Sequence, residues 1–296
     1  YRYRIYSRCF IISSTKKQVR IMSKDWTKIR AKVKDFIESE IYPKETELAK
    51  GTPEAREMLG SLMQLAKDEK IWALGHPEDI GGGGMPFMEY VYVNEVIGRS
   101  SFAMVALGTH SLQDSIMLRE FASPHWRDQY LEPLVQGEIF PSFGMTEPDV
   151  ASSDPTQLQT TAILENGTWK INGTKWFTTG AARAAYTTVM CRTELDAPSH
   201  GAFSMIIVPT DNPGYKIVRE TPVLGINGGH YEVKYDNVEV PEENLLGPRG
   251  QGFIIAQKRL GPGRIFHCMR WLGQAQRAFD LLLSLIHISE PTRQLC

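Results

Sequence analysis

The sequence predicts an α+β protein in which a helical region, a β region and a second helical region follow one another. Apolar residues recur at helical spacing over residues 25–137 and again over residues 253–283. Over residues 139–240 the pattern changes to alternation of apolar and polar residues, which is typical of strands. Because the short strands are separated by turn signals and not by helices, we expect a compact antiparallel barrel or sandwich, and not a doubly wound sheet.

The change of period also defines the expected domains. These are an N-terminal helical domain at 22–138, a central β domain at 139–246 and the first part of a C-terminal helical-bundle domain at 247–283. The expected helices are Asp25–Ile41 (ending at Pro43), Pro53–Lys67, Met88–Ile97, Ser101–Leu107, Ser111–Phe121, Ser123–Gly137, Phe253–Leu260 and Ile265–Leu283. The expected strands are Ile139–Thr146, Leu158–Leu164, Trp169–Thr179, Tyr186–Arg192, Ala202–Pro209, Tyr215–Glu220 and Glu232–Val240.

The two ends of the chain differ from the rest in composition. Residues 1–21 are rich in Arg, Lys and Ser and contain no acid, which is typical of a mitochondrial transit peptide. We favour the alternative that residues 1–21 are a translation of the untranslated region upstream of the start codon, because Met22 precedes the first clear helix. The basic composition of residues 1–21 nevertheless makes a mitochondrial location the expectation, with a peroxisomal or cytoplasmic one as alternatives. Residues 284–296 lose the helical pattern, and we interpret them as a non-native tail.

Composition excludes several classes of function. The formal net charge of −1 gives no reason to expect a nucleic acid or a membrane surface as partner. No apolar run reaches the roughly 18 residues that span a bilayer. The four cysteines are scattered, so we expect neither a zinc site nor a disulfide framework. His110 and His125 are isolated, and we expect capping or surface positions for them and no metal site.

A run of glycines lies within residues 76–86, HPEDIGGGGMP. Such a run could cradle a phosphate, but it lacks the Gly-x-Gly-x-x-Gly spacing and the strand-turn-helix context. We therefore favour a flexible connection.

The most informative stretch is Phe143–Asp154, FGMTEPDVASSD, which is followed by Thr174–Gly180, TKWFTTG. Two Asn-Gly pairs, Asn166-Gly167 and Asn172-Gly173, lie between them and predict tight hairpin turns that fold the two stretches toward each other. The loop hydroxyls lack the partners of a catalytic nucleophile. Hydroxyls and free backbone amides favour a site for a polar ligand or cofactor. A surface loop capped by the last aspartate is the alternative.

Three motifs in order resemble the acyl-CoA dehydrogenase family. They are PSFGMTEPDVASSD, INGTKWFTTG and YDNVEVPEENLLG. The resemblance covers Trp26 to Leu283. The form TEPDVASS departs from the commoner TEPGAGSD and resembles the branch of family members ten and eleven.

The resemblance implies FAD as cofactor, bound by Phe143, Met145, Thr146, Ser152, Ser153, Trp176, Phe177 and Thr178. Thr146 and neighbouring amides would meet the pyrimidine edge of the flavin, and Thr178 would bond it near the hydride-accepting nitrogen. Trp176 would pack against the ring. Ser152 or Ser153 would lie near the FAD pyrophosphate and the pantetheine arm of the substrate, and Ser153 is favoured because it precedes Asp154.

The resemblance also implies that Arg264 neighbours the bound substrate, with a surface ion pair as the alternative. The implied reaction is α,β-dehydrogenation of an acyl-CoA thioester in fatty acid β-oxidation, with electrons passing to an electron-transferring flavoprotein. The catalytic base is expected beyond Leu283, because the alternative family position is occupied here by Gly263. We therefore expect a C-terminally truncated chain whose full-length form is a homo-oligomer.

Two other functions stay open at this point. A flavin-dependent oxidase or monooxygenase of the same fold would use oxygen instead of a protein partner. A non-catalytic binding or scaffolding protein would bind flavin weakly and turn over no substrate.

Overall fold

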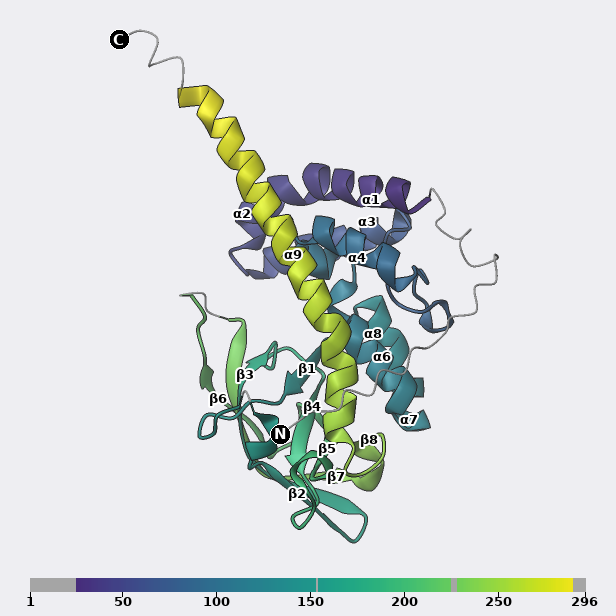
Figure 1. The fold of residues 1–296 in the computed structure, drawn as a ribbon, viewed down its shortest axis with the longest axis vertical. Coiled ribbons are helices and arrows are strands. Elements are labelled where there is room, and N and C mark those ends of the chain that lie inside the picture. Colours follow the sequence, from purple (N-terminus) through teal and green to yellow (C-terminus); the bar gives the residue numbers. More distant parts are fainter. Residues whose placement is uncertain (1–24, 153, 225–227, 290–296) are drawn as a thin grey trace, which may run out of the picture.

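The computed structural model describes residues 25–152, 154–224 and 228–289, and confirms the α+β architecture (Figure 1). The two ends predicted to be non-native lie wholly or in part outside this range. Figure 1 shows N-terminal helices on one side, the sheet on the other, and one long helix that runs past both. None of the described helices combines the length and the apolar character needed to cross a membrane.

The N-terminal helices surround one apolar core. It contains fully buried residues such as Val33, Ile37, Val93 and Ala106. The α-helices here are α1 (Asp25–Phe36), α2 (Glu45–Leu48), α3 (Pro53–Asp68), α4 (Phe87–Ile97), α5 (Ala103–Ala106), α6 (Leu112–Phe121), α7 (Pro124–Trp126) and α8 (Glu132–Gln136). Short π-helices at Ile37–Ile41 and Arg127–Leu131 and 3-10 turns at Tyr42–Lys44, Glu78–Ile80 and Thr109–Ser111 connect them.

The first helix does not end at Pro43 as predicted. The chain stays helical through a π-turn and a 3-10 turn to Leu48, with Pro43 at the start of the 3-10 turn. Proline is tolerated there because a residue in the first helical turn needs no N–H partner within the helix.

The glycine run forms hydrogen-bonded turns. The amides of Gly82, Gly83 and Gly84 each donate to a backbone carbonyl of residues 73–77. Since these donors already have partners, they offer no free cradle for a phosphate. The flexibility expected of this connection stays a prediction.

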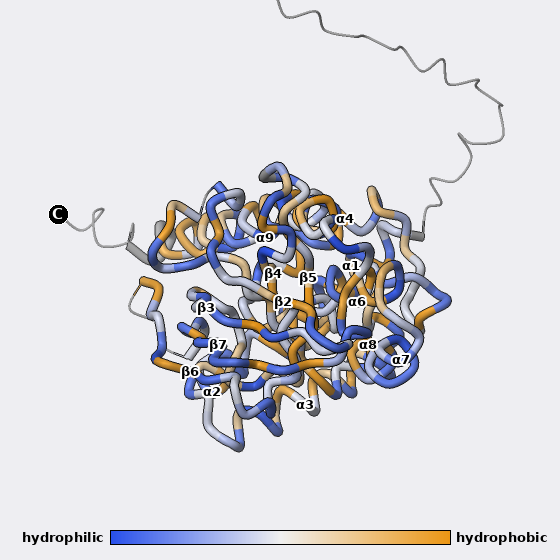
Figure 2. Tube along the Cα trace, turned by 90° about the horizontal axis from the view of Figure 1, so that it is seen from below, coloured by the Kyte–Doolittle hydropathy of each residue, from blue (hydrophilic) through white to orange (hydrophobic). Residues whose placement is uncertain are grey.

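The β region is one eight-stranded sheet with the order β6-β7-β3-β2-β4-β5-β8, and β1 pairs with β4. Strand β5 is wholly apolar at its centre and runs through the interior (Figure 2). The sheet is not purely antiparallel as predicted, because β1 and β2 each pair in parallel with β4. The strands are β1 (Pro141–Gly144), β2 (Thr161–Glu165), β3 (Thr168–Thr179), β4 (Tyr186–Arg192), β5 (Phe203–Pro209), β6 (Tyr215–Glu220), β7 (His230–Pro241) and β8 (Leu245–Leu246).

Of the two Asn-Gly pairs, only the first makes a hairpin turn. Asn166 and Gly167 both have positive φ and connect β2 to β3. The second prediction is wrong, since β3 continues through Asn172 and Gly173 with a shift in register against β7. Glycine is required at 173 because a Cβ there would lie 2.7 Å from the Cα of Thr160.

A single helix, α9 (Gly252–Ser289), follows the sheet. The prediction of two helices separated at residues 261–264 is wrong, and the predicted end at Leu283 is six residues too early. Pro262 lies inside α9 although a proline there removes one backbone hydrogen bond. Burial of Ile255 and Ala256 before it and of Phe266 after it holds the two halves in line.

Helix α9 crosses α4 at a pair of glycines. A Cβ on Gly98 would overlap the carbonyl of Arg270, and a Cβ on Gly273 would overlap the carbonyl of Glu95. Beyond the crossing, Arg277 donates to Glu45 at 2.6 and 2.7 Å. Close backbone contact and this ion pair fix α9 against the N-terminal helices.

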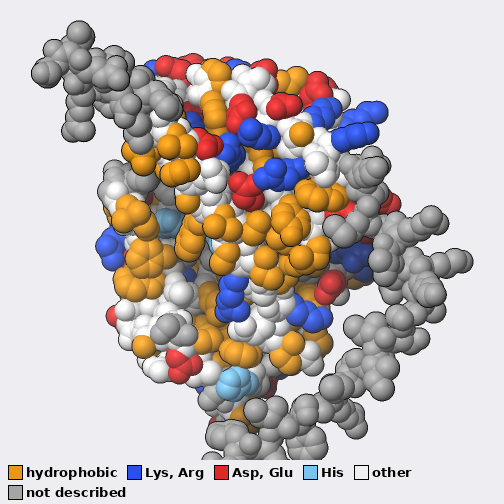
Figure 3. Space-filling view, turned by 45° about the horizontal axis from the view of Figure 1, so that its top comes forward, with side chains coloured by type: hydrophobic (Ala, Val, Ile, Leu, Met, Phe, Trp, Pro, Cys, Tyr) orange, Lys and Arg blue, Asp and Glu red, His pale blue; other side chains and the backbone are white. Residues whose placement is uncertain are grey.

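The opposite side of α9 remains largely uncovered. Its exposed apolar side chains include Trp271, Leu272, Phe279, Leu282 and Leu285. Figure 3 shows a broad band of hydrophobic side chains on one face of the molecule. Such surfaces are rare on monomeric proteins and mark interaction sites.

A buried ion pair ties the loop after β1 to β3. The Lys175 ammonium lies 2.8 Å from Glu147 Oε1 and 2.9 Å from the carbonyl oxygen of Met145, and both side chains are almost completely buried. The backbone amides of Gln159 and Thr160 donate to the same carboxylate at 2.7 and 2.9 Å. Burial alone would raise the pKa of Glu147, but the Lys175 charge and these donors hold it below its ordinary value.

The close contact between α4 and α9 at Gly273 predicts that one added methyl group there lowers the stability of the protein. Gly273→Ala is expected to destabilise the protein by about 1–3 kcal/mol, because the added Cβ meets rigid backbone. Gly60→Ala, in an open stretch of α3 with nothing within 4 Å, is the control and should stabilise by about 0.5–1 kcal/mol. Denaturant unfolding measures both. Equal effects of the two substitutions would contradict close packing at the crossing.

The ion pair predicts a large cost when one partner is removed. Lys175→Met should lower the free energy of unfolding by about 3–5 kcal/mol, since it leaves Glu147 buried without its cation. Lys216→Met is the control, because its pair with Asp236 is exposed, and should cost less than about 1 kcal/mol.

The same pair predicts a dependence on pH. Because the folded-state pKa of Glu147 is lowered, its contribution is complete above the unfolded pKa of about 4.3 and is lost as pH falls through the folded value. Wild type should therefore lose more stability than Glu147→Gln between about pH 5 and pH 3. Parallel pH profiles would contradict this assignment.

Candidate functional site

A bulge in β3 separates the side chains of the TKWFTTG motif. The register against β7 shifts between Lys175 and Thr178, and Phe177 has a left-handed φ of 48°. As a result Lys175 and Thr178 are both buried, whereas Trp176 is half-buried and Phe177 is 44% exposed. Bulges and strained residues of this kind occur next to binding and active sites.

The loop after β1 is hydrogen-bonded to this bulge. Thr146 Oγ1 donates to the carbonyl of Trp176 at 2.8 Å, and the Trp176 amide donates to the carbonyl of Thr146 at 3.0 Å. The structure thus brings Met145, Thr146 and Trp176 together as predicted. The proton of the Thr146 hydroxyl is already donated within the protein, so only its lone pairs are available to a ligand.

Ser152 has a structural role in the loop. Its hydroxyl accepts from the Glu147 amide at 2.8 Å and donates to the Glu147 carbonyl at 2.9 Å. Asp154 caps the next turn through the amide of Thr156 at 3.0 Å. Ser153, the serine favoured from the sequence, lies outside the described residues. The loop is therefore closed by its own polar groups.

Thr178 is one of several buried polar side chains that make no hydrogen bond within the described part of the chain. Its side chain is fully buried, and among the described residues Oγ1 makes no hydrogen bond. A buried hydroxyl without a partner costs about 1–3 kcal/mol. A flavin whose ring bonds to Thr178 and packs on Trp176 would remove that cost, so these residues fit the cofactor implied by the sequence.

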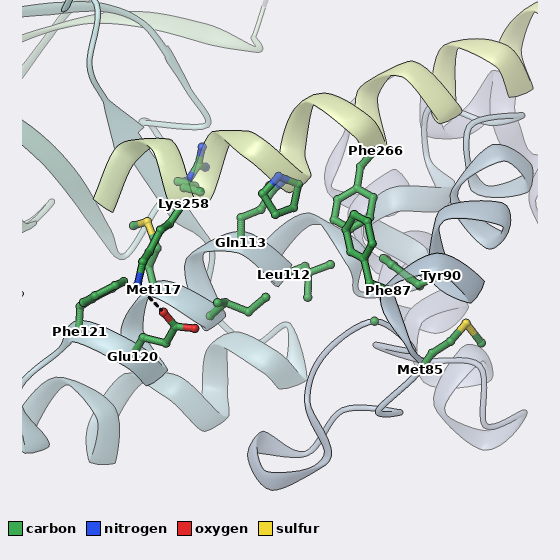
Figure 4. A pocket seen from close by; sticks show the side chains of 14 residues that line it. Met85, Phe87, Tyr90, Leu112, Gln113, Met117, Glu120, Phe121, Lys258 and Phe266 are labelled. Atoms are coloured by element: carbon green, nitrogen blue, oxygen red, sulfur yellow. Dashed lines mark ion pairs between the residues drawn. The ribbon is translucent and has the colours of Figure 1, made fainter. Parts of the chain in front are cut away.

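An elongated cavity of about 400 Å³ lies between α4, α6 and the first half of α9 (Figure 4). One end is aromatic, where Phe266 packs against Phe87 and Tyr90 at centroid distances of 5.5 and 5.3 Å. At the other end Lys258 pairs with Glu120 at 3.6 Å. The volume falls in the range of small-molecule sites, which are mostly apolar with a few polar groups.

Arg259 joins the cavity to β1. It lines the cavity and pairs with the buried carboxylate of Asp114 at 3.1 Å, and its guanidinium lies 4.2 Å from the centre of the Phe143 ring. Phe143 is one of the residues predicted to line the flavin. The β3–β1 region and the cavity are therefore neighbouring parts of one candidate site.

Arg264 does not line the cavity. It is exposed on α9, and its contact is with Gln257 at 3.5 Å. Sequence reasoning selected Arg264, considered Gly263 only as a position that cannot carry the base, and missed Arg259 and Phe266. Arg259, Gly263 and Phe266 share one face of α9. Their spacing of three to four residues is a signal that would have found this face if the helix had been predicted as continuous.

The two isolated histidines differ in environment. His125 is exposed, as expected. His110 packs on Phe140 at a centroid distance of 4.8 Å, so its expected capping or surface position is wrong. Burial lowers the pKa of His110 to about 4, and the ring is neutral at pH 7.

Curated relatives of this chain include three named acyl-CoA dehydrogenases. The probable acyl-CoA dehydrogenase FadE2 of Mycobacterium tuberculosis is 41% identical over 271 residues, which is 87% of this chain and 66% of the relative. Acyl-CoA dehydrogenase family member 10 of Mus musculus is 37% identical over 86% of this chain and 25% of the relative. Acyl-CoA dehydrogenase family member 11 of Homo sapiens is 35% identical over 90% of this chain and 36% of the relative. The chain thus spans between a quarter and two thirds of these relatives.

Solved structures give the same result for the fold. An acyl-CoA dehydrogenase structure from Mycobacterium abscessus superposes with a TM-score of 0.81 at 35% identity, over 87% of this chain and 69% of that one. The acyl-CoA dehydrogenase N-terminal domain matches residues 23–138, and the middle domain of the same family matches residues 142–238. With both domains present in order, this chain belongs to the acyl-CoA dehydrogenase family.

Proposed function

We propose that this protein carries out FAD-dependent α,β-dehydrogenation of acyl-CoA thioesters. The observation that supports this most directly is the buried hydroxyl of Thr178, which lies two residues after Trp176 and makes no hydrogen bond among the described residues. The apolar cavity adjoins β1 through Arg259, which lines the cavity and contacts Phe143. Family membership supports an oxidoreductase of this type. The use of FAD and a place in fatty acid β-oxidation are part of the proposal.

The residues of β1 and β3 would hold the cofactor. Trp176 offers a half-buried ring for packing, Thr178 a hydrogen bond, and the loop at Met145 and Thr146 a rigid edge. When bound, FAD supplies the hydride acceptor for the β-hydrogen of the substrate. The Lys175–Glu147 pair keeps the loop in place against β3, so that the binding residues are positioned before any ligand arrives.

The cavity would hold the acyl chain and keep water away from it. Leu112, Ile116, Met117 and Phe266 supply apolar contacts along its length. Exclusion of water strengthens electrostatic interactions at the reacting carbons and prevents side reactions.

We assign no catalytic base. Gly263 occupies the position on α9 where some relatives carry one and has no side chain to accept a proton. Glu120 lines the cavity but is exposed and paired with Lys258, so it lacks the dry surroundings that a base requires.

The wider setting is part of the same proposal. Electrons would pass to an electron-transferring flavoprotein, and copies of the protein would associate as a homo-oligomer. The exposed apolar side chains of α9 support association. A mitochondrial location, based on the basic residues of 1–21, stays a prediction.

Thr178→Val tests the cofactor site with opposite effects on two measurements. Removing a buried hydroxyl without a partner should raise the stability of the flavin-free protein by about 1 kcal/mol. The same change should weaken FAD binding about five- to tenfold, measured by quenching of flavin fluorescence, because one hydrogen bond is lost.

Tyr42→Phe is the control, since the Tyr42 hydroxyl is also buried without a partner among the described residues but lies in the N-terminal helical region, away from β3. It should raise stability and leave FAD affinity unchanged. If Thr178→Val and Tyr42→Phe had the same effect on FAD affinity, the assignment of Thr178 to the cofactor would fail.

Anaerobic addition of acyl-CoA thioesters of several chain lengths tests the reaction. We expect the visible absorbance of bound flavin to be bleached by at least one of them and restored by an electron-transferring flavoprotein. Absence of bleaching with every chain length would refute dehydrogenation. Rapid reoxidation by air alone would instead indicate an oxidase.

A further inference from the structure

We propose that His230, at the start of β7, is a positioning residue for the cofactor site and acts through Thr179. It holds the bulge of β3 in the shape that presents Trp176 and Thr178 to FAD. The inference rests on the proposed function, since it takes these two residues as cofactor contacts. The sequence analysis did not select His230, which lies on a different strand from the residues of β1 and β3 that it did select.

The bulge is a strained part of β3. Phe177 has a φ of 48°, in the left-handed region that a residue with a Cβ rarely adopts. Its side chain is 44% exposed, so burial of the ring does not hold it there. A strained backbone of this kind persists only where the neighbouring structure fixes it. The contacts of the residues before and after Phe177 therefore set the shape of the bulge.

The residue before Phe177 is fixed by the loop after β1. The Trp176 amide donates to the Thr146 carbonyl at 3.0 Å, and the Thr146 hydroxyl donates to the Trp176 carbonyl at 2.8 Å. The Lys175–Glu147 pair holds that loop in turn. These contacts form a first anchor, but they leave the far end of the bulge to be held by other groups.

Thr179 is the second anchor. Its carbonyl accepts a hydrogen bond from Ser142 Oγ of β1 at 2.8 Å, and its Oγ1 lies 2.9 Å from Nδ1 of His230. Thr179 and His230 are also direct partners in the β3–β7 pairing. Thr178 thus lies between two anchored residues, while its own hydroxyl makes no hydrogen bond among the described residues.

His230 contacts the strained residue as well. Its ring lies 6.4 Å from the Phe177 ring at 67°, an edge-to-face arrangement, and the Phe177 ring lies 4.8 Å from that of Trp176. A change at His230 therefore reaches Trp176 through ring contacts and Thr178 through the backbone of Thr179.

His230→Leu tests this role with and without FAD. Loss of one hydrogen bond that positions the bulge should weaken FAD binding about three- to tenfold, measured by quenching of flavin fluorescence. In the flavin-free protein, amide hydrogen exchange of residues 176–180 should become faster, because the bulge opens more often. Stability in denaturant should change little, since Thr179 is exposed and His230 is half-buried.

Three further variants separate positioning by His230 from a direct contact with FAD. His230→Asn keeps a polar group that can bond to Thr179, and it should restore most of the FAD affinity. Thr179→Val should weaken FAD binding, and adding it to His230→Leu should cause no further loss, because both remove the same hydrogen bond. His125→Leu is the matched control, since His125 is an exposed histidine that contacts Trp126 edge-to-face at 6.0 Å, and should leave FAD affinity unchanged.

Unchanged FAD affinity and hydrogen exchange in His230→Leu would overturn the inference alone. So would effects of His230→Leu and Thr179→Val that add in the double variant, or a His230→Asn variant as weak as His230→Leu. If the wild-type protein took up no FAD, the proposed function would fall and this inference with it.

Discussion

The buried contact between Lys175 and Glu147 is the constraint on which the candidate site depends. Each group would be unstable in the interior without the other, since desolvation of an isolated charge costs several kcal/mol. Together they fix the loop after β1 to the middle of β3, and the backbone amides of Gln159 and Thr160 complete the carboxylate's hydrogen bonds. The loop cannot leave the strand without exposing a charge to an apolar interior. Two motifs that are separate in sequence therefore act as one rigid element.

The sequence predicted that the loop after β1 and strand β3 lie together, but it did not predict the bulge and the buried ion pair that join them. The hairpin at Asn166-Gly167 and the alternation along β3 are local signals, and they were sufficient to bring Thr146 and Trp176 together. The bulge at Phe177 was not predictable, because a strict alternation of two would place Lys175 and Phe177 on one face. Only the ladder with β7 shows that the chain gains one residue there. That extra residue is the reason why Lys175 and Thr178 are both buried.

The error at residues 261–264 has a different physical origin. Glycine and proline weaken a helix by roughly 1 and 3 kcal/mol, so local propensity favours a break. Tertiary packing opposes it, because α9 is held at its start by the sheet and farther along by the crossing at Gly98 and Gly273. Helix boundaries follow from local sequence where packing is weak. Here the packing on both sides of Pro262 outweighs the low helix propensity of residues 261–263. For that reason the helix face that lines the cavity was not recognised from the sequence.

Because α9 is continuous, it fixes the position of β1 relative to the cavity. Arg259 contacts Phe143 of β1 on one side and the cavity on the other, while Phe266 of the same helix face closes the aromatic end. Since a single helix carries both residues, the distance between β1 and the aromatic end of the cavity is set by helix geometry. A break at Pro262 would decouple them. The helix that sequence propensity divides is thus the element that fixes β1 relative to the cavity.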